Sequence, residues 1–218
     1  MRLIFSSILV CAFYTCAAQT QESVSFGYEY RIAGFTIPAL LTYIPANQAI
    51  EYIEITQASQ RTSPEGYEFK IPYSYLLWRT NLIDSMATEI RSIDHKGRKN
   101  ISCTYPSGIK WQISGEEKVV GSTTLQKATT EALPRASLHQ GTATAWFDPA
   151  IPFPAGPGRY WGLPGLIVEL TFSETGESYS LVNTDHSALR DTPPPSQTVE
   201  VPYEVILDPL AFSPGRLD

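Results

Sequence analysis

Short stretches in which apolar and polar residues alternate recur along almost the whole chain, and this pattern constrains the fold more than any other feature. Alternation with a period of two places one set of side chains on each face of a β-strand. Polar turn signals such as Gly115–Glu117 separate the stretches, and sequential strands joined by short turns pair as an antiparallel meander. A helical stripe of apolar residues is absent over any three turns, and only Trp78–Ala87 could form a short helix. We expect strands at Phe26–Ile32, Ala49–Thr56, Tyr67–Ile71, Thr88–Asp94, Lys99–Tyr105, Ile109–Ser114, Thr123–Glu131, Gly141–Phe147, Leu166–Phe172, Ser178–Asn183 and Val199–Leu207. The sequence therefore predicts an all-β fold, either a curved antiparallel meander sheet or a half-open barrel.

The first eighteen residues form a predicted secretory signal peptide. Met1 and Arg2 give a basic start, and Leu3–Cys16 is almost unbroken apolar or small. Cys16–Ala18 then offers small residues at both positions that a signal peptidase reads. The apolar run is too short and wrongly flanked for a membrane-spanning helix. We expect a mature chain that begins at Gln19, has no membrane span, and is periplasmic or secreted.

The cysteines support the same compartment. Cleavage after Ala18 leaves Cys103 as the single cysteine, and a secreted protein with one thiol has no internal disulfide framework. Burial alone must then stabilise the chain. Cys103 lies in an alternating segment, which predicts a small buried or half-buried strand residue, with a reactive thiol as the alternative. A lipoprotein signal at Cys11 or Cys16 is a second alternative, disfavoured by bulky residues before Cys16.

Composition and charge limit the partners. The chain of 218 residues carries 22 acidic and 16 basic side chains, which gives a formal net charge of -6. This balance disfavours nucleic acid and anionic membrane surfaces as partners. Aromatic residues make up 11% of the sequence, which argues against disorder. We expect residues 19–218 to form a single β domain.

The segment Pro149–Gly165, which we call the corner loop, differs from the rest of the chain. It holds five prolines and four glycines in 17 residues. A connection of this length between two strands is uncommon in a compact domain. Its apolar side chains predict an ordered loop, and Leu163–Leu166 fits a type II turn with positive φ at Gly165. Two interpretations remain open: the loop plugs one end of the sheet, or it offers a surface for a ligand or partner. That candidate surface comprises Trp146, Tyr160, Trp161, Gly162, Leu163, Pro164 and Gly165.

The same region resembles a known family. Ala145–Pro152, Gly156–Pro157 and Gly162–Glu169 are similar to the hallmark of the GLPGLI family (the Porph_ging domain) of secreted bacterial proteins. Upstream, Lys110–Ile113 and Gln126–Thr129 match the strands that precede this hallmark in the family. The resemblance implies a periplasmic or exported β-protein whose biochemical function is not established. It supplies no catalytic residues.

Catalytic signatures are weak throughout the sequence. The three histidines, His95, His139 and His186, occur in separate loop-like contexts without metal-ligand spacing, and we predict that they are solvated. The sequence has no Gly-x-Ser-x-Gly elbow, no His-Glu-x-x-His and no phosphate-binding glycine loop before a helix. No catalytic residue, metal ligand or cofactor is therefore predicted.

We expect an extracytoplasmic, non-enzymatic binding or accessory protein of the bacterial envelope. Its partner would be an outer-membrane or other envelope protein, a peptide or an apolar ligand. The alternative is an unrecognised periplasmic hydrolase or redox enzyme, centred on Cys103 or on a histidine–aspartate pair.

Overall fold

The computed structural model describes residues 22–62, 68–71, 73–93, 99–133, 139–192 and 198–203. The predicted signal peptide with its cleavage before Gln19, the histidine at position 95 and the end of the predicted last strand lie outside the described residues. Within the described part of the chain, no helix is both long enough and apolar enough to cross a membrane.

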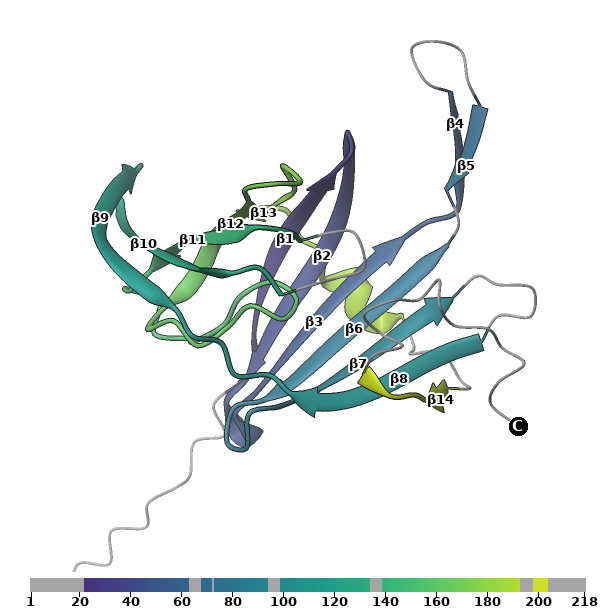
Figure 1. Ribbon diagram of the computed structural model, residues 1–218, viewed down its shortest axis with the longest axis horizontal. Coiled ribbons are helices and arrows are strands. Elements are labelled where there is room, and N and C mark those ends of the chain that lie inside the picture. The colour runs from purple at the N-terminus through teal and green to yellow at the C-terminus, as the bar shows by residue number, and fades with distance from the viewer. Residues whose placement is uncertain are drawn as a thin grey trace, which may run out of the picture.

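The fold is all-β, as predicted, and is built around one large open sheet of twelve strands (Figure 1). A separate two-stranded hairpin, β4 (Ser59–Thr62) and β5 (Glu68–Ile71), projects from it. The described residues also include two short 3-10 helices, η1 (Pro45–Asn47) and η2 (Ser187–Asp191). The strands of the large sheet are β1 (Val24–Ile32), β2 (Phe35–Ile44), β3 (Ala49–Thr56), β6 (Ser74–Asn81), β7 (Met86–Ile93), β8 (Lys99–Pro106), β9 (Gln112–Val120), β10 (Thr123–Glu131), β11 (Thr142–Asp148), β12 (Leu166–Phe172), β13 (Ser178–Val182) and β14 (Thr198–Glu200).

The large sheet consists of two meanders joined in the middle. From β1 the strand order runs one way through β2, β3, β6, β7 and β8, and the other way through β13, β12, β11 and β10 to β9. All these pairs are antiparallel, and among the described strands only the short β14 pairs in parallel, with β8. Residues 107–111 connect β8 to β9, although β8 lies near one edge of the sheet and β9 forms the other edge. The predicted meander is confirmed, and the sheet is not closed into a barrel.

One face of the sheet carries the main core. Along a single row of paired residues, Phe26, Leu41, Tyr52 and Trp78 point to this face. The corner loop packs against the same face, because its residues Tyr160 and Leu163 belong to the same buried cluster. We call it the loop-covered face. Burial of each large side chain here contributes roughly 1.5–3 kcal/mol to stability.

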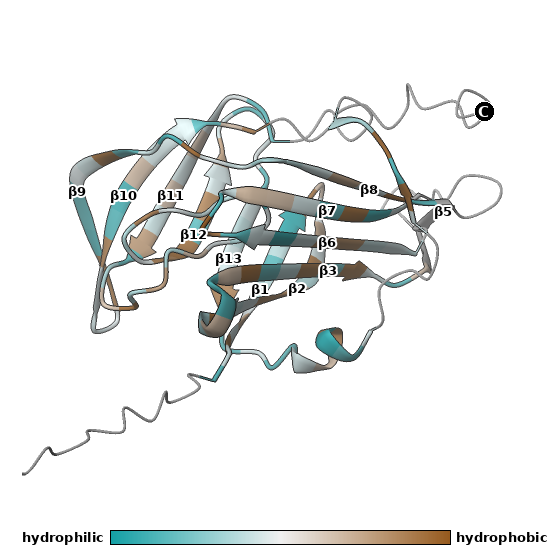
Figure 2. Ribbon diagram, turned by 90° about the horizontal axis from the view of Figure 1, so that it is seen from below, coloured by the Kyte–Doolittle hydropathy of each residue, from teal (hydrophilic) through white to brown (hydrophobic). Residues whose placement is uncertain are grey.

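The opposite face has a smaller cluster beneath η2. Ile53, Ile55, Tyr75 and Leu77 are buried there, and Leu189 of η2 packs against them. Figure 2 shows η2 on the outer side of β3, away from the corner loop. Strands β3 and β6 are thus covered on both faces.

Two local predictions are wrong. The segment proposed as a possible helix is instead β6, a turn at residues 82–85 and β7. Side-chain oxygens stabilise that turn, since Asn81 Oδ1 accepts from the Ile83 N–H at 2.9 Å and Asp84 Oδ1 from the Met86 N–H at 3.0 Å. The turn expected at Gly115–Glu117 lies inside β9, where Glu116 forms an ion pair with Lys127 on β10.

Candidate functional site

Proline sets the conformation of the corner loop. Three times, a backbone N–H donates to the carbonyl two residues earlier across a proline, at N···O distances of 2.7, 2.7 and 2.8 Å for Pro152, Pro154 and Pro164. These are γ-turns, which suit the fixed φ of proline. Further bonds tie the loop to itself and to β12, because Gly162 N–H donates to Pro154 O and Ile167 N–H to Ala155 O. The loop is therefore ordered, as its composition predicts.

The predicted type II turn is wrong, and Gly165 is needed for another reason. Its φ is not positive; the positive values in this part of the loop belong to Gly158 (60°) and Gly162 (92°). A Cβ at Gly165 would lie 2.3 Å from the carbonyl oxygen of Asp148 and 2.9 Å from the Cα of Pro149. The glycine therefore permits close approach of two backbone segments at the base of the loop.

The seven predicted surface residues separate into three groups. Tyr160 and Leu163 are each 1% exposed, and Gly165 is also buried. This central part of the loop is thus a plug in which Gly162 and Pro164 are exposed.

The two tryptophans of the predicted set lie apart from each other. Trp161 is partly buried against the main core, and its carbonyl accepts from Trp111 Nε1 at 2.8 Å. Trp146 is partly exposed on the opposite face of the sheet, where Lys118 Nζ lies 4.6 Å from its ring centroid. Trp146 therefore does not join the corner loop in one surface.

The tip of the plug carries a buried ion pair that the sequence did not reveal. Arg159 Nη2 donates to Glu89 Oε2 on β7 at 3.0 Å, with side chains 4% and 0% exposed. Arg91 Nε donates to the other oxygen of Glu89, and the Tyr105 hydroxyl donates to Oε2 at 3.2 Å. Burial, and next the charge of Glu89, raise the pKa of Tyr105 above its usual range. Buried charges require such partners, because desolvation of each ion is expensive.

His139 also departs from prediction: it is buried, 5% exposed, and not solvated. Its backbone N–H donates to Glu177 Oε2 at 3.2 Å, and its Nε2 lies 3.2 Å from the Tyr179 hydroxyl. Its ring stacks on Phe172 at 4.1 Å between centroids. The histidine is a packed part of the loop-covered face.

The cysteine and the other described histidine lie in different surroundings. Cys103 forms no disulfide and is buried among Ala87, Ile101, Tyr105 and Val201, as its alternating segment predicts. His186 lines a cavity of about 560 Å³ beside β1 and β13. Among the described residues, no three histidine, cysteine, aspartate or glutamate side chains are placed to hold a metal ion.

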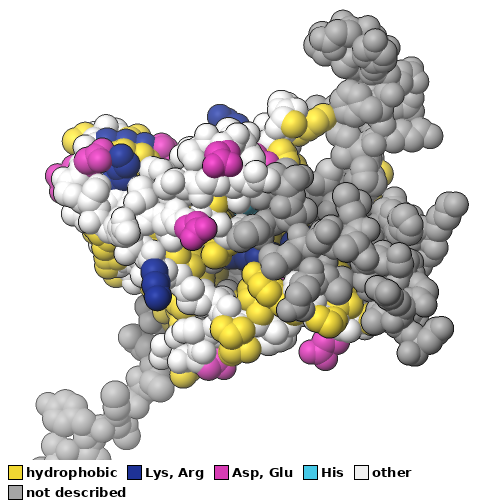
Figure 3. All heavy atoms as spheres, in the orientation of Figure 1, with side chains coloured by type: hydrophobic (Ala, Val, Ile, Leu, Met, Phe, Trp, Pro, Cys, Tyr) yellow, Lys and Arg dark blue, Asp and Glu magenta, His cyan; other side chains and the backbone are white. Residues whose placement is uncertain are grey.

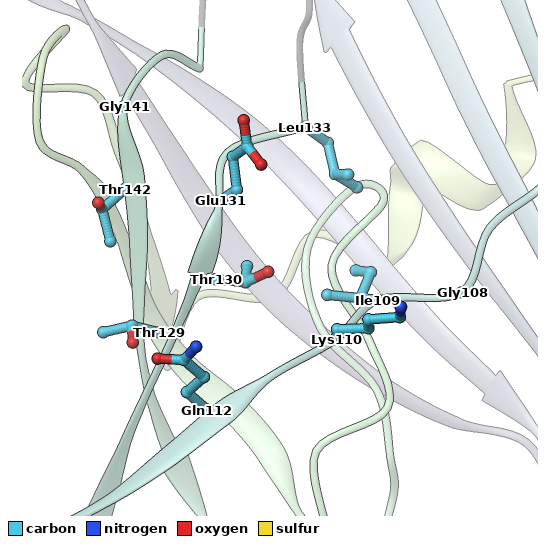
Figure 4. Close-up of a pocket in the computed structure, with 10 residues that line it drawn as sticks. All are labelled: Gly108, Ile109, Lys110, Gln112, Thr129, Thr130, Glu131, Leu133, Gly141 and Thr142. Atoms are coloured by element: carbon cyan, nitrogen blue, oxygen red, sulfur yellow. The ribbon is translucent and has the colours of Figure 1, made fainter.

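A cleft opens where β9 separates from β10 (Figure 4). Its volume is about 580 Å³, and the connection before β9, the end of β10 and the start of β11 line it. Lys110 and Glu131 both line this cleft, are exposed, and make no ion pair within the described ranges. By contrast, Lys118 and Lys127 nearby on β9 and β10 are each paired with a glutamate.

The fold and these features describe a plugged open β-sheet protein with a polar cleft at one side. The sequence model of a family described as "Protein of unknown function (Porph_ging)" matches residues 134–169, which include β11 and the whole corner loop. The resemblance to the GLPGLI family is thereby confirmed over this segment. No curated protein sequence matches the chain.

A solved structure of PNGF-II has a similar fold. One, in the P21 space group, is 9% identical with a TM-score of 0.50, over 83% of this chain and 31% of that chain. Another, in the C2 space group, is 10% identical with a TM-score of 0.47, over 85% of this chain and 32% of that chain. The chain thus spans about a third of the length of PNGF-II, and at this identity the likeness concerns the fold alone.

Proposed function

We propose that the chain is an extracytoplasmic, non-enzymatic binding or accessory protein that holds an extended segment of an envelope protein along β9. The observation that carries this proposal is the free edge of that strand. β9 is nine residues long and ends the strand order, so only β10 pairs with it among the described residues. An extended peptide can add to such an edge by main-chain hydrogen bonds.

Apolar side chains on β9 support this proposal. Six large hydrophobic residues are exposed in the described part of the chain, and three of them are Ile113 (53%), Val119 (71%) and Val120 (51%) on β9. In Figure 3, hydrophobic side chains emerge beside acidic and basic ones on the side formed by β9 and β10. Exposed apolar groups on an edge strand are usually avoided, because they invite pairing with another chain.

The other edge of the sheet offers less. β14 has only three residues, so it presents a short template.

The predicted signal peptide and the family resemblance favour the envelope as the location. The separate positions of Cys103, His139 and His186 among the described residues favour binding over catalysis by a cysteine–histidine pair.

The test is site-specific photocrosslinking in the envelope of the native host. A photoreactive residue at Val119 should form an adduct with a defined envelope protein, whereas the same residue at Ile83 should not. Ile83 is the matched control, because it is also 71% exposed but lies in the turn between β6 and β7.

A second measurement quantifies the contact. A synthetic peptide from the crosslinked segment should bind the mature chain, and Val119→Lys should weaken that binding by about tenfold or more. Ile83→Lys should leave it unchanged. Equal crosslinking at both positions, or equal affinity of both variants, would remove β9 as the binding edge.

A further inference from the structure

We propose that the cleft between β9 and β10 binds the backbone of a short peptide with free, charged termini. This site is separate from the outer edge of β9 and goes beyond the function proposed above.

Strand β10 continues beyond its pairing with β9. The last paired residues are Gln112 on β9 and Thr129 on β10. Thr130 and Glu131 still pair with Ala143 and Thr142 on β11, but their other side faces the cleft. Residues 107–111, which lead from β8 to β9, are not paired with this end of β10. A strand edge two residues long is therefore open to a ligand. The N–H and C=O of Glu131 face this open side, because successive residues alternate along the strand and Ala132 N–H donates to Gly141 O on the β11 side.

The open edge fixes the direction of a bound peptide. β9 runs antiparallel to β10, so a peptide that extends the same ladder backwards from Gln112 would also run antiparallel to β10. Its C-terminus would then lie toward Gln112 and Lys110, and its N-terminus toward Glu131. At about 3.4 Å per residue, an edge of two residues suits a dipeptide or tripeptide.

The charges at the two ends match this direction. Figure 4 shows Glu131 at the far end of β10 and Lys110 on the connection that leads into β9. Lys110 can receive the carboxylate of the ligand, and Glu131 can receive its ammonium group. Both side chains make no ion pair among the described residues, although Lys118 and Lys127 nearby do.

The remaining lining suits a peptide of low side-chain specificity. The side chains of Gln112, Thr129, Thr130 and Thr142 provide amide and hydroxyl groups that can donate or accept hydrogen bonds. Ile109 and Leu133 add apolar surface on one side. A volume of about 580 Å³ lies within the range of small-ligand sites.

The experiment uses trialanine in four forms: free, N-acetylated, C-amidated and blocked at both ends. Calorimetry with the mature chain should show binding of free trialanine, and each block should weaken it by about tenfold, as for the loss of one charge-assisted hydrogen bond. Chemical shifts of the Thr130 and Glu131 amides should move on titration.

Two variants assign each terminus. Glu131→Gln should weaken the binding of free trialanine. Acetylation of the peptide should then cause no further loss of affinity, whereas amidation should still weaken binding. Lys110→Gln should do the reverse. Glu200→Gln is the control, because Glu200 is an exposed carboxylate on β14, at the opposite edge of the sheet, and should change neither preference.

Several outcomes would overturn the site. The first is equal binding of free and doubly blocked trialanine. The second is a preference for free over blocked termini that neither variant changes. The third is a set of chemical-shift changes confined to residues outside the cleft. Absence of trialanine binding at millimolar concentration, or binding of an uncharged oligosaccharide such as chitotriose at the cleft instead, would also overturn it. Failure of the β9 crosslinking experiment would not affect this result, since the outer edge of β9 is not used.

Discussion

Arg159 at the tip of the corner loop donates to Glu89 on β7 at 3.0 Å, and both side chains are almost fully buried. The pair connects a segment that follows β11 to the other meander of the sheet. Arg159 also donates to the hydroxyl of Tyr203, the last described residue, at 3.2 Å. The loop, the sheet and the C-terminal segment therefore meet at one guanidinium group.

Removal of one member of this pair should destabilise the protein strongly. Glu89→Leu should lower the free energy of unfolding by about 3–5 kcal/mol, because it removes the carboxylate that faces the buried Arg159 guanidinium. Arg159→Met should cost less, since Arg91 and Tyr105 still donate to Glu89. The double variant should recover part of this loss. Arg31→Met is the control, since the Arg31–Glu29 pair is exposed and should contribute under about 1 kcal/mol. Urea denaturation measures all four, and additive losses in the double variant would contradict the coupling.

The two glycines near the end of the loop should respond differently to alanine. Gly165→Ala should cost about 3 kcal/mol or more, because the added Cβ meets backbone atoms of Asp148 and Pro149 that cannot move independently. Gly162→Ala should cost about 1 kcal/mol, since its φ of 92° is unfavourable for alanine but the space beside it is open. Thermal unfolding of the two variants compares them, and a larger loss at Gly162 would reverse this account.

Tyr160 should be the main anchor of the plug. Tyr160→Ala should lower the free energy of unfolding by about 3–5 kcal/mol, as for other fully buried aromatic residues. Tyr160→Phe should cost about 1–2 kcal/mol, because the Leu133 N–H loses an acceptor 2.9 Å away. Trp161→Ala should cost less than Tyr160→Ala, since Trp161 is only partly buried. Chemical denaturation would show the reverse order if Trp161 were the anchor.

Alkaline pH should destabilise the fold through two buried phenols. Burial raises the pKa of Tyr28, and burial together with Glu89 raises that of Tyr105. An unfolded tyrosine releases its proton near pH 10, whereas these two keep theirs in the folded state. The unfolded state then binds fewer protons, so stability falls as pH rises above about 10, by up to about 1.4 kcal/mol per pH unit for each group.

This pH dependence can be assigned by substitution. Tyr105→Phe should remove one of the two contributions, so that stability falls less steeply above about pH 10. Titration followed by phenolate absorbance should show phenols that ionise only on unfolding. If every tyrosine ionised in the folded protein, the interpretation of Tyr28 and Tyr105 would be wrong.

The ends of three strands were predictable, and these include β3, although both of its faces are covered. The bounds of β3, β10 and β12 match the predicted segments to the residue. β2 and β6 were missed, because Leu40 and Leu41 on β2 and Leu76 and Leu77 on β6 are buried on successive positions. Their faces are both covered, so the sequence lacks the alternation that marks a strand.

The candidate site was predictable only in part. The density of proline and glycine identified the corner loop and its order. The contacts of the loop could not be predicted from the sequence, because Glu89 lies far from Arg159 in the chain and is only one polar residue within an alternating strand. His139 was misjudged for the same reason, because Glu177 and Tyr179 reach it from a later hairpin. The cleft beside β10 depends on where two strands separate, which no local pattern marks.

The seam between β1 and β13 has a consequence for how the chain folds. Each meander consists of hairpins between neighbouring segments. The seam instead pairs Tyr30 on β1 with Tyr179 on β13, and the two rings stack with their centroids 4.4 Å apart. Contacts between such distant residues carry the largest loop-closure cost and slow folding. We expect the two meanders to form early and to join last at this seam, so that pulse-labelling hydrogen exchange finds the β1 amides facing β13 protected latest. The rate of folding is then set at the centre of the sheet and not at its edges.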